Sequence, residues 1–333
     1  MATISQIAKE ADVSRTLVSR VLNNKPGVSP ENRRKILEII EKHHYVPNGL
    51  ARALVLQRTM TIGVVMDDLC NDFFFDLIAG LQDAGEEHGY NILFCSGRKD
   101  IGTKMKYVDY FSQGRTDGII AYGSNRADEA LFRSIAAKSV NCVLIEGNLD
   151  DCKVDKIRLD NFHGAYVATE HLIKQGYHNI IHITNDMNYD VSLERLNGFV
   201  QAMHDYRIPL GPGSIVYGDC YEEAAYQQMK KLLAEGKKPD ACFVGADKPA
   251  FGVLRAAMDA GLSIPGDLAV IGFDDDTPES RDIVFPGLST MRQPLYEMGR
   301  AGVELLLDAI EHPDRETKTQ TFEAELVLRD TCR

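Results

Sequence analysis

The sequence predicts an α/β protein: an N-terminal helix-turn-helix head and a hinge helix joined to a two-lobed, doubly wound parallel α/β body. Apolar residues recur at helical spacing over the first 45 residues, and buried-strand runs alternate with helical stretches from residue 61 onward. The charge also differs, because residues 1–58 hold ten Lys and Arg against five Asp and Glu, and the remainder holds 27 against 44. We therefore expect the head at 1–46, a hinge helix and linker at 47–60, and the body at 61–333.

Two short amphipathic helices joined by a tight turn open the head. From Thr3 to Ala11 the apolar side chains lie three and four residues apart, which puts them on one helical face. Asp12 and Val13 follow in the turn, and Ser14 stands where an N-cap belongs. In the second helix the outward-facing side chains are Arg15, Thr16, Ser19 and Arg20. A second helix with Arg, Thr and Ser near its start suits entry into a DNA major groove.

A third helix is needed, because two helices this short are unstable alone. Ser29 and Pro30 give it an N-cap and a proline at its first position. Its apolar face consists of Ile36, Ile39 and Ile40. Pro47 stops this helix, since the residue before a proline is pushed out of the helical region. Residues 48–56 form a short Asn-capped helical pattern that is too short to be stable in isolation, and DNA is one candidate for ordering it.

Composition restricts the partners and the compartment. The net charge of −12 argues against nucleic acid, but the basic first 58 residues favour a DNA-facing head on an acidic body that phosphates repel. The seven Cys form no CxxC pair, and neither a disulfide framework nor a zinc cluster is indicated. No apolar run reaches the roughly 18 residues of a membrane span, and no signal-peptide core opens the chain. We expect a cytoplasmic protein with no membrane partner.

The body alternates strands and helices. Buried strands are expected at 62–66, 91–95, 118–122, 142–145, 180–184, 215–217, 241–244 and 268–273. Three of the intervening helices end alike, at Gly89, Gly176 and Gly261, where glycine suits the left-handed C′ position and a strand begins shortly after. The recurrence indicates two similar lobes with a cleft between them. In such sheets ligands bind beyond the carboxyl ends of the strands.

Polar and aromatic residues gather where these strands end. Asp67 and Asp68 follow the first strand, and carboxylates or amides follow most of the others. Carboxylates that accept hydroxyl protons, beside flat apolar faces, suit a polyhydroxylated ligand such as a sugar. Alternatively, these residues have a structural role, because Asp and Asn also cap the helices that follow the strands. For a lone carboxylate, helix capping is favoured over ligand binding.

We find no catalytic constellation and predict no enzyme activity. The sequence has no glycine-rich phosphate loop of either common type and no GxSxG motif. His178 and His182 have a spacing seen in metal sites, but on a strand they are more often a structural pair. The acidic run 274–276 lies among non-ligating neighbours and lacks a phosphate loop that would favour Mg²⁺. No cofactor or metal is therefore expected.

Longer stretches resemble the LacI/GalR family of bacterial transcription regulators. The run ISQIAKEADVSRTLVSRVLN is followed by VSPENRRKILEIIEKHHYVPNGLARAL, and the likeness continues through DNFHGAYVATEHLIKQGYHNI and LSIPGDLAVIGFDD to ELVLRDTC. It covers essentially the whole chain in order, and the pattern of head plus hinge is far more specific than a generic helix-turn-helix. The resemblance implies a repressor that binds operator DNA under allosteric control by a small ligand, with a body like that of periplasmic sugar-binding proteins.

The resemblance also implies roles in the head. Arg15 and Thr16 match the family's base-reading pair, and Arg15 suits a bidentate contact with guanine. The family's phosphate and groove contacts are matched by Ser14, Ser19, Arg20 and Asn23. Leu54 matches the hinge leucine that wedges into the minor groove and kinks the DNA. A family dimer places two such heads on a pseudo-palindromic operator.

In the body, Arg195 and Asp274 match the family's effector-binding arginine and aspartate. Further pocket positions are matched by Phe73, Phe74, Glu146 and Asp247. Family effectors are most often sugars or sugar phosphates and occasionally nucleobases. Five positions depart from the pattern. Asp12 replaces a turn glycine, Leu17 a common threonine, Gln6 a frequent aspartate, Ala246 an asparagine and Gly147 a frequent arginine. These changes leave the regulator assignment intact but weaken any choice of effector.

Two other classes of function remain as alternatives: a solute-binding protein with the same body, and an α/β enzyme that acquired a head. The basic head and the missing signal peptide disfavour the first. The lack of a nucleophile, metal site or phosphate loop disfavours the second. The chain carries no heptad tail after the body, which favours a homodimer over a tetramer.

Overall fold

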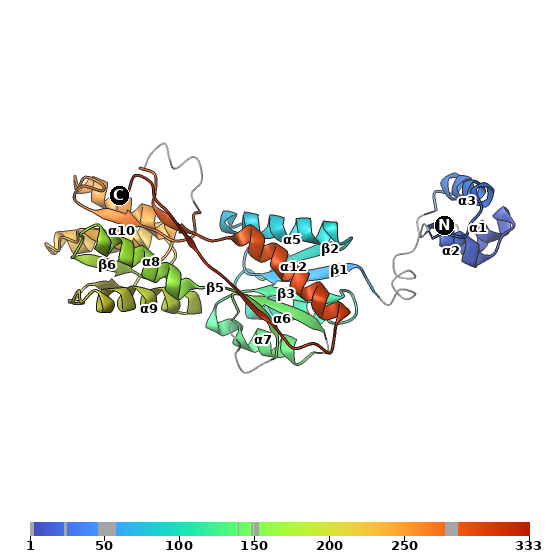
Figure 1. The fold of residues 1–333 in the computed structure, drawn as a ribbon, viewed down its shortest axis with the longest axis horizontal. Coiled ribbons are helices and arrows are strands. Elements are labelled where there is room, and N and C mark those ends of the chain that lie inside the picture. The colour runs from blue at the N-terminus through green and yellow to red at the C-terminus, as the bar shows by residue number, and fades with distance from the viewer. Residues whose placement is uncertain are drawn as a thin grey trace. The chain divides into compact units, whose positions relative to one another are not determined.

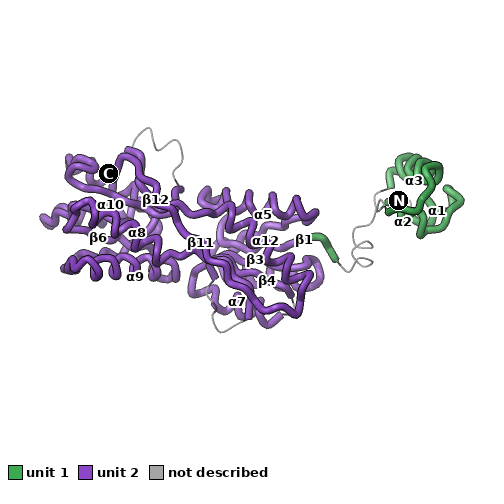
Figure 2. Tube along the Cα trace, viewed as in Figure 1, with its two compact units in different colours: residues 1–60 green, residues 61–333 purple. Residues whose placement is uncertain are grey.

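The computed structural model describes most of the chain (Figure 1). The described residues are 3–22, 25–45, 58–138, 140–147, 149, 153–276 and 286–333. The chain divides into two compact units, residues 1–60 and residues 61–333 (Figure 2). Asn23, Leu54 and the expected hinge helix at 48–56 lie outside the described residues. Of the helices that are described, none is long and apolar enough to cross a membrane.

The described part of the first unit forms three helices. They are α1 (Ile4–Ala11), α2 (Arg15–Leu22) and α3 (Pro30–Lys42). Thr3 and Gln6 cap α1 reciprocally, because each side chain accepts from the backbone N–H of the other residue. Asp12 adopts the left-handed conformation (φ +55°), which confirms that the turn keeps its shape without glycine. Ser14 Oγ accepts from the Leu17 N–H (3.2 Å) and is the predicted N-cap of α2.

The core of the head is the apolar face predicted from residue spacing. It contains Ile7, Ala8, Ala11, Val18, Val21, Ile36 and Ile39. Glu10 fixes α1 against the end of α3, since its two carboxylate oxygens contact Lys42 (2.7 Å) and His43 (2.5 Å). The end of α3 falls at Lys42, several residues before Pro47, because His44 takes a left-handed conformation (φ +45°).

Two parallel sheets form in the described residues of the second unit (Figure 1). The larger has the strand order β11-β5-β4-β3-β1-β2 and the smaller the order β7-β6-β8-β9. Strands of the larger sheet are β1 (Thr61–Met66), β2 (Asn91–Ser96), β3 (Gly118–Tyr122), β4 (Asn141–Ile145), β5 (Asp155–Leu159) and β11 (Thr319–Phe322). Strands of the smaller are β6 (Ile180–Ile183), β7 (Ile215–Val216), β8 (Ala241–Val244) and β9 (Ala269–Ile271). The two predicted lobes are therefore confirmed, and we call the larger sheet with its helices lobe 1 and the smaller lobe 2.

Helices cover both faces of each sheet, as in a doubly wound fold. In lobe 1, α5 (Phe75–Glu87) packs with α12 (Leu295–Glu311) on one face, and α6 (Ile101–Phe111) with α7 (Glu129–Ala136) on the other. The short 3-10 helices η1 (Asp72–Phe74) and η2 (Arg126–Asp128) precede α5 and α7.

Lobe 2 repeats this arrangement with four helices of its own in the described residues. They are α8 (Asn161–Lys174) packed with α9 (Asp190–Asp205), and α10 (Glu222–Ala234) packed with α11 (Asp247–Asp259). The three predicted glycine ends, Gly89, Gly176 and Gly261, all have left-handed φ angles (+73°, +93° and +75°). Glycine thus follows the end of α5 in lobe 1 and of α8 and α11 in lobe 2.

Four described strands were not predicted. Two lie in the larger sheet, β5 and β11, and two pair with each other antiparallel, β10 (Thr290–Arg292) and β12 (Glu325–Val327). In the described residues the chain crosses between lobes after β5, between β10 and α12, and between β11 and β12 (Figure 1). These strands therefore lie next to the points where the chain passes between the lobes.

Candidate functional site

The exposed face of α2 carries the side chains predicted to read DNA. Arg15 and Thr16 occupy the first two positions of the helix, and both are exposed, as are Ser14 and Arg20. Ser19 is half-buried. Donors at the N-terminus of a helix suit contact with phosphates and base edges. The structure thus presents these residues on one short helix.

Arg195 and Asp274, the predicted effector-binding pair, meet in the body. Nη1 of Arg195 donates to the Gly245 carbonyl (2.7 Å) and lies 3.3 Å from Asp274 Oδ1. Nε donates to Asn161 Oδ1 (2.9 Å), and the guanidinium lies 3.7 Å from the Phe273 ring centroid. The side chains of the pair are 6% and 14% exposed. Burial of both charges is tolerated because each has a partner.

Asp274 occupies a special backbone position at the end of β9. Its φ is +122°, a conformation that non-glycine residues avoid and that is typical of functional sites. Gln293 Nε2 donates to Asp274 Oδ1 (2.7 Å). Burial raises the pKa of Asp274 to about 6, although the Arg195 guanidinium opposes the shift. Within the described residues, Asp274 Oδ2 accepts no hydrogen bond and Arg195 Nη2 donates none. One acceptor atom and one donor atom of the pair therefore remain for a ligand.

An aromatic wall stands on the lobe 1 side of this pair. Phe74 is buried between Phe73 and Tyr122, with both ring centroids 4.9 Å away and edge-to-face geometry. Burial raises the pKa of the Tyr122 phenol well above its usual value, and the charges of Glu146 and Asp274 act in the same direction. Tyr122 was not among the predicted binding residues, although its place at the end of a buried strand was a usable signal.

Glu146 and Asp247 use their carboxylates within the protein. Glu146 accepts from the Leu159 N–H (2.6 Å) and from Asn161 Nδ2 (3.0 Å), and burial raises its pKa to about 7. Asp247 is fully buried, accepts from Thr290 Oγ1 (2.6 Å) and from the Asp276 N–H (2.9 Å), and has a pKa raised well above normal by burial.

The contacts of these two carboxylates define their place in the site. Glu146 anchors the crossing segment after β5 at Asn161, which in turn holds Arg195. Asp247 anchors the end of β9 to β10. The structure therefore places them behind the Arg195–Asp274 pair.

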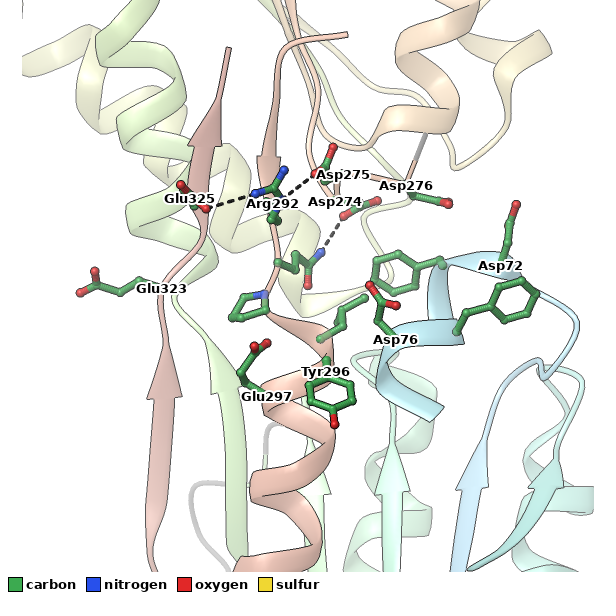
Figure 3. A pocket seen from close by; sticks show the side chains of 15 residues that line it. Asp72, Asp76, Asp274, Asp275, Asp276, Arg292, Tyr296, Glu297, Glu323 and Glu325 are labelled. Atoms are coloured by element: carbon green, nitrogen blue, oxygen red, sulfur yellow. Dashed lines mark hydrogen bonds and ion pairs between the residues drawn. The ribbon is translucent and has the colours of Figure 1, made fainter. Parts of the chain in front are cut away.

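A cavity of about 880 Å³ is lined by Asp274 of this pair (Figure 3). The predicted Arg195, Phe74, Glu146 and Asp247 are not among its lining residues. Its lining includes the predicted Phe73 and Asp274 together with Gln293 from the crossing segment before α12. Further carboxylates surround it: Asp72, Asp76, Asp275, Asp276, Glu297, Glu323 and Glu325. Arg292 contacts Asp275 (2.7 Å) and Glu325 (3.4 Å), as the dashed lines of Figure 3 show. The cavity thus offers many oxygen acceptors for hydroxyl groups.

His178 and His182, which have a spacing seen in metal sites, differ in their surroundings. No group of three or more His, Cys, Asp or Glu side chains among the described residues is arranged to hold a metal ion. His182 is stacked between Phe199 and Phe243 in lobe 2, and burial lowers its pKa to about 4. It is a core residue, and His178 does not share its burial.

The head and the body are both similar to known proteins. The sequence model for bacterial regulatory proteins of the lacI family matches residues 3–48, and that for a periplasmic binding protein-like domain matches residues 169–332. Catabolite control protein A of Priestia megaterium is 32% identical, over 91% of each chain. HTH-type transcriptional repressor PurR of Aliivibrio fischeri is 31% identical, over 99% of this chain and 98% of its own. A solved complex of the transcriptional regulator CelR with cellobiose has a TM-score of 0.73 at 26% identity, covering 99% of this chain and 100% of that one.

Proposed function

The chain belongs to the lacI family of bacterial regulatory proteins and is a DNA-binding transcriptional regulator, and on this premise we propose that it is a cytoplasmic, homodimeric repressor controlled by a sugar-like effector. Two heads would bind the halves of a pseudo-palindromic operator. A ligand in the cleft would change the relation of the two lobes and with it the affinity for the operator. Ligand and operator must then alter each other's affinity by the same factor.

The Arg195–Asp274 pair carries the ligand half of this proposal. A sugar hydroxyl both donates and accepts hydrogen bonds, so it can donate one to Asp274 Oδ2 while accepting one from Arg195 Nη2. The pair is pre-oriented by Asn161 and Gln293, which lowers the entropy lost on binding. Phe73, with Phe74 packed against it, would supply the flat apolar surface that a pyranose ring needs.

The remaining predicted residues take supporting roles in the proposal. Glu146 would position Asn161, which holds Arg195, and Asp247 would position the segment that carries Asp274. In the head, Arg15 and Thr16 would read bases. The phosphate and groove contacts would come from Ser14, Ser19, Arg20 and Asn23, with Leu54 as the minor-groove wedge.

A thermal-shift screen tests the ligand half. The panel contains cellobiose, common mono- and disaccharides, sugar phosphates and nucleobases. A ligand that binds only the folded state stabilises it by about 2.7 kcal/mol at one hundred times its Kd, and so raises Tm. Arg195→Ala and Asp274→Ala should abolish the shift, while Arg133→Ala, which removes a surface pair with Glu129, should keep it. A shift retained in both cleft variants would place the ligand elsewhere.

Operator binding tests the other half. Palindromic sites selected from random DNA by the full-length protein should be bound far more tightly than scrambled DNA. The affinity should fall steeply with salt, because each phosphate contact releases a counterion. A shallow salt dependence without sequence preference would refute the proposed operator recognition.

A further inference from the structure

Lys248, in lobe 2, reaches across the cleft to lobe 1. Its Nζ donates to Asn71 Oδ1 at 2.6 Å and lies 2.7 Å from Asp72 Oδ1, in the turn where η1 begins. Asp276 of lobe 2 adds a third oxygen at 3.3 Å. The ion pair therefore joins the lobes directly, at the edge of the cavity that Asp72 and Asp276 line.

The position of Lys248 is unfavourable for its own helix. It is the second residue of α11, and the N-terminus of a helix favours anions over cations. Asp247 and Pro249 on either side are both well suited to a first turn. A residue that breaks a local rule while its neighbours obey it indicates a compensating contact elsewhere. Here Asn71 and Asp72 of the other lobe supply that contact.

The same lysine connects the two halves of the ligand site. Asn71 Oδ1 also accepts from the Phe73 N–H (3.3 Å) and so caps the turn that carries the aromatic wall. Asp276 lies two residues after Asp274 and is itself bonded through its N–H to Asp247. The hydrogen bond from Lys248 lowers the pKa of Asp72 despite partial burial, so the carboxylate stays charged at neutral pH.

We propose that Lys248 is a latch that holds the lobes closed in the ligand-free protein and releases when the cleft opens to admit a ligand. The identity of the ligand rests on the proposed function. The closure itself involves neither ligand nor DNA, so it is measured on the unliganded chain.

A reporter for closure lies away from Lys248. The Arg126 N–H donates to the Asn188 carbonyl (3.0 Å) and the Asp190 N–H to the Ser124 carbonyl (2.8 Å), so both amides bridge the lobes. Such amides exchange with solvent when the lobes separate. Hydrogen exchange of full-length, ligand-free Lys248→Met should be roughly three- to tenfold faster than wild type at these two amides, in line with the loss of one partly exposed ion-pair cluster.

Two further variants make the test specific. Asp72→Ala removes the latch from the lobe 1 side and should accelerate the same amides, and the double variant should add little beyond either single one. Lys174→Met is the matched control, because Lys174 pairs with Glu170 (2.9 Å) inside α8, within one lobe. It should leave both amides at the wild-type rate.

Each outcome of the exchange measurement decides for or against the latch. Unchanged exchange at Arg126 and Asp190 in both Lys248→Met and Asp72→Ala overturns the latch. A uniform acceleration that includes the core amides of α8 also overturns it, since that pattern reports global destabilisation. If both variants accelerate exchange at these two amides but no ligand of the panel raises Tm, the latch stands and only the proposed ligand class is wrong.

Discussion

Arg195 and Asp274 contact each other at 3.3 Å, yet within the described residues each keeps one polar atom without a protein partner. The contact keeps both charges stable in a site where the side chains are almost fully buried. The free atoms keep the pair available to a ligand. One interaction thus serves stability and recognition together, and its loss should be visible even without ligand.

Removal of the guanidinium should destabilise the body. Arg195→Met leaves the Asp274 carboxylate buried beside Gln293 alone, and breaking a buried pair in this way costs about 3 kcal/mol. Asp274→Asn should cost less, because the Arg195 guanidinium keeps its contacts with Asn161, the Gly245 carbonyl and the Phe273 ring. The double variant should be more stable than the sum of the single effects predicts, which urea unfolding at neutral pH would measure. Strict additivity would show that the two residues are energetically independent.

Glu146 should make the body less stable as the pH rises. Burial raises its pKa from 4.5 to about 7, so the folded state holds this proton more tightly than the unfolded chain. The contribution of Glu146 to the free energy of unfolding therefore falls by about 3 kcal/mol between about pH 4.5 and 7, and it stays constant above about pH 7.

The neutral isostere isolates this effect. Glu146→Gln cannot titrate, so its free energy of unfolding minus that of wild type should increase across the same pH interval. Contributions from other groups, including Asp274, cancel in the difference. A difference that stays constant from about pH 4.5 to 8 would mean that Glu146 is ionised normally.

The head and the sheets were predictable because their signals are local. Helical spacing placed Ile7, Val18 and Ile36 in one core, and continuous apolar runs marked the central strands such as β3 and β8. Most of the four missed strands are rich in polar residues, as in the sequences DKIRL of β5 and TQTF of β11. β11 forms because Thr319 pairs with Lys156, far away in the chain, and no local pattern carries that information.

The ligand site was predictable only in part for the same reason. Arg195 and Asp274 came from the resemblance to a family, whereas Asn161, Gln293 and Tyr122 gain their roles from the crossing segments and from neighbouring strands. Lys248 follows Asp247 in an ordinary helix start, and nothing near it in the sequence points to Asp72. Contacts between lobes are decided by the topology, which residue spacing does not encode.

Arg15 and Ser14 should have separable effects in the head. Ser14→Ala removes the N-cap of α2 and should lower the stability of the head by about 1 kcal/mol. Arg15→Ala should leave stability unchanged and weaken binding to the selected operator by about 1–3 kcal/mol, with little effect on scrambled DNA. Arg34→Ala, at an exposed position of α3, is the control. Equal losses of affinity for the selected operator and for scrambled DNA would mean that Arg15 contacts phosphates and not bases.

Two glycines inside helices should respond in opposite directions to alanine. A Cβ at Gly198 of α9 would lie 2.2 Å from the Phe162 carbonyl oxygen of α8, so the two helices must separate. A Cβ at Gly102 of α6 would meet nothing closer than the Asp100 carboxylate at 3.5 Å. Gly198→Ala should therefore destabilise lobe 2 by about 1–3 kcal/mol, and Gly102→Ala should stabilise lobe 1 by up to about 1 kcal/mol through helix propensity. The midpoints of urea unfolding, compared between variants with the same m-value, measure both changes. A Gly198→Ala variant as stable as wild type would show that α8 and α9 lie farther apart than the 2.2 Å approach implies.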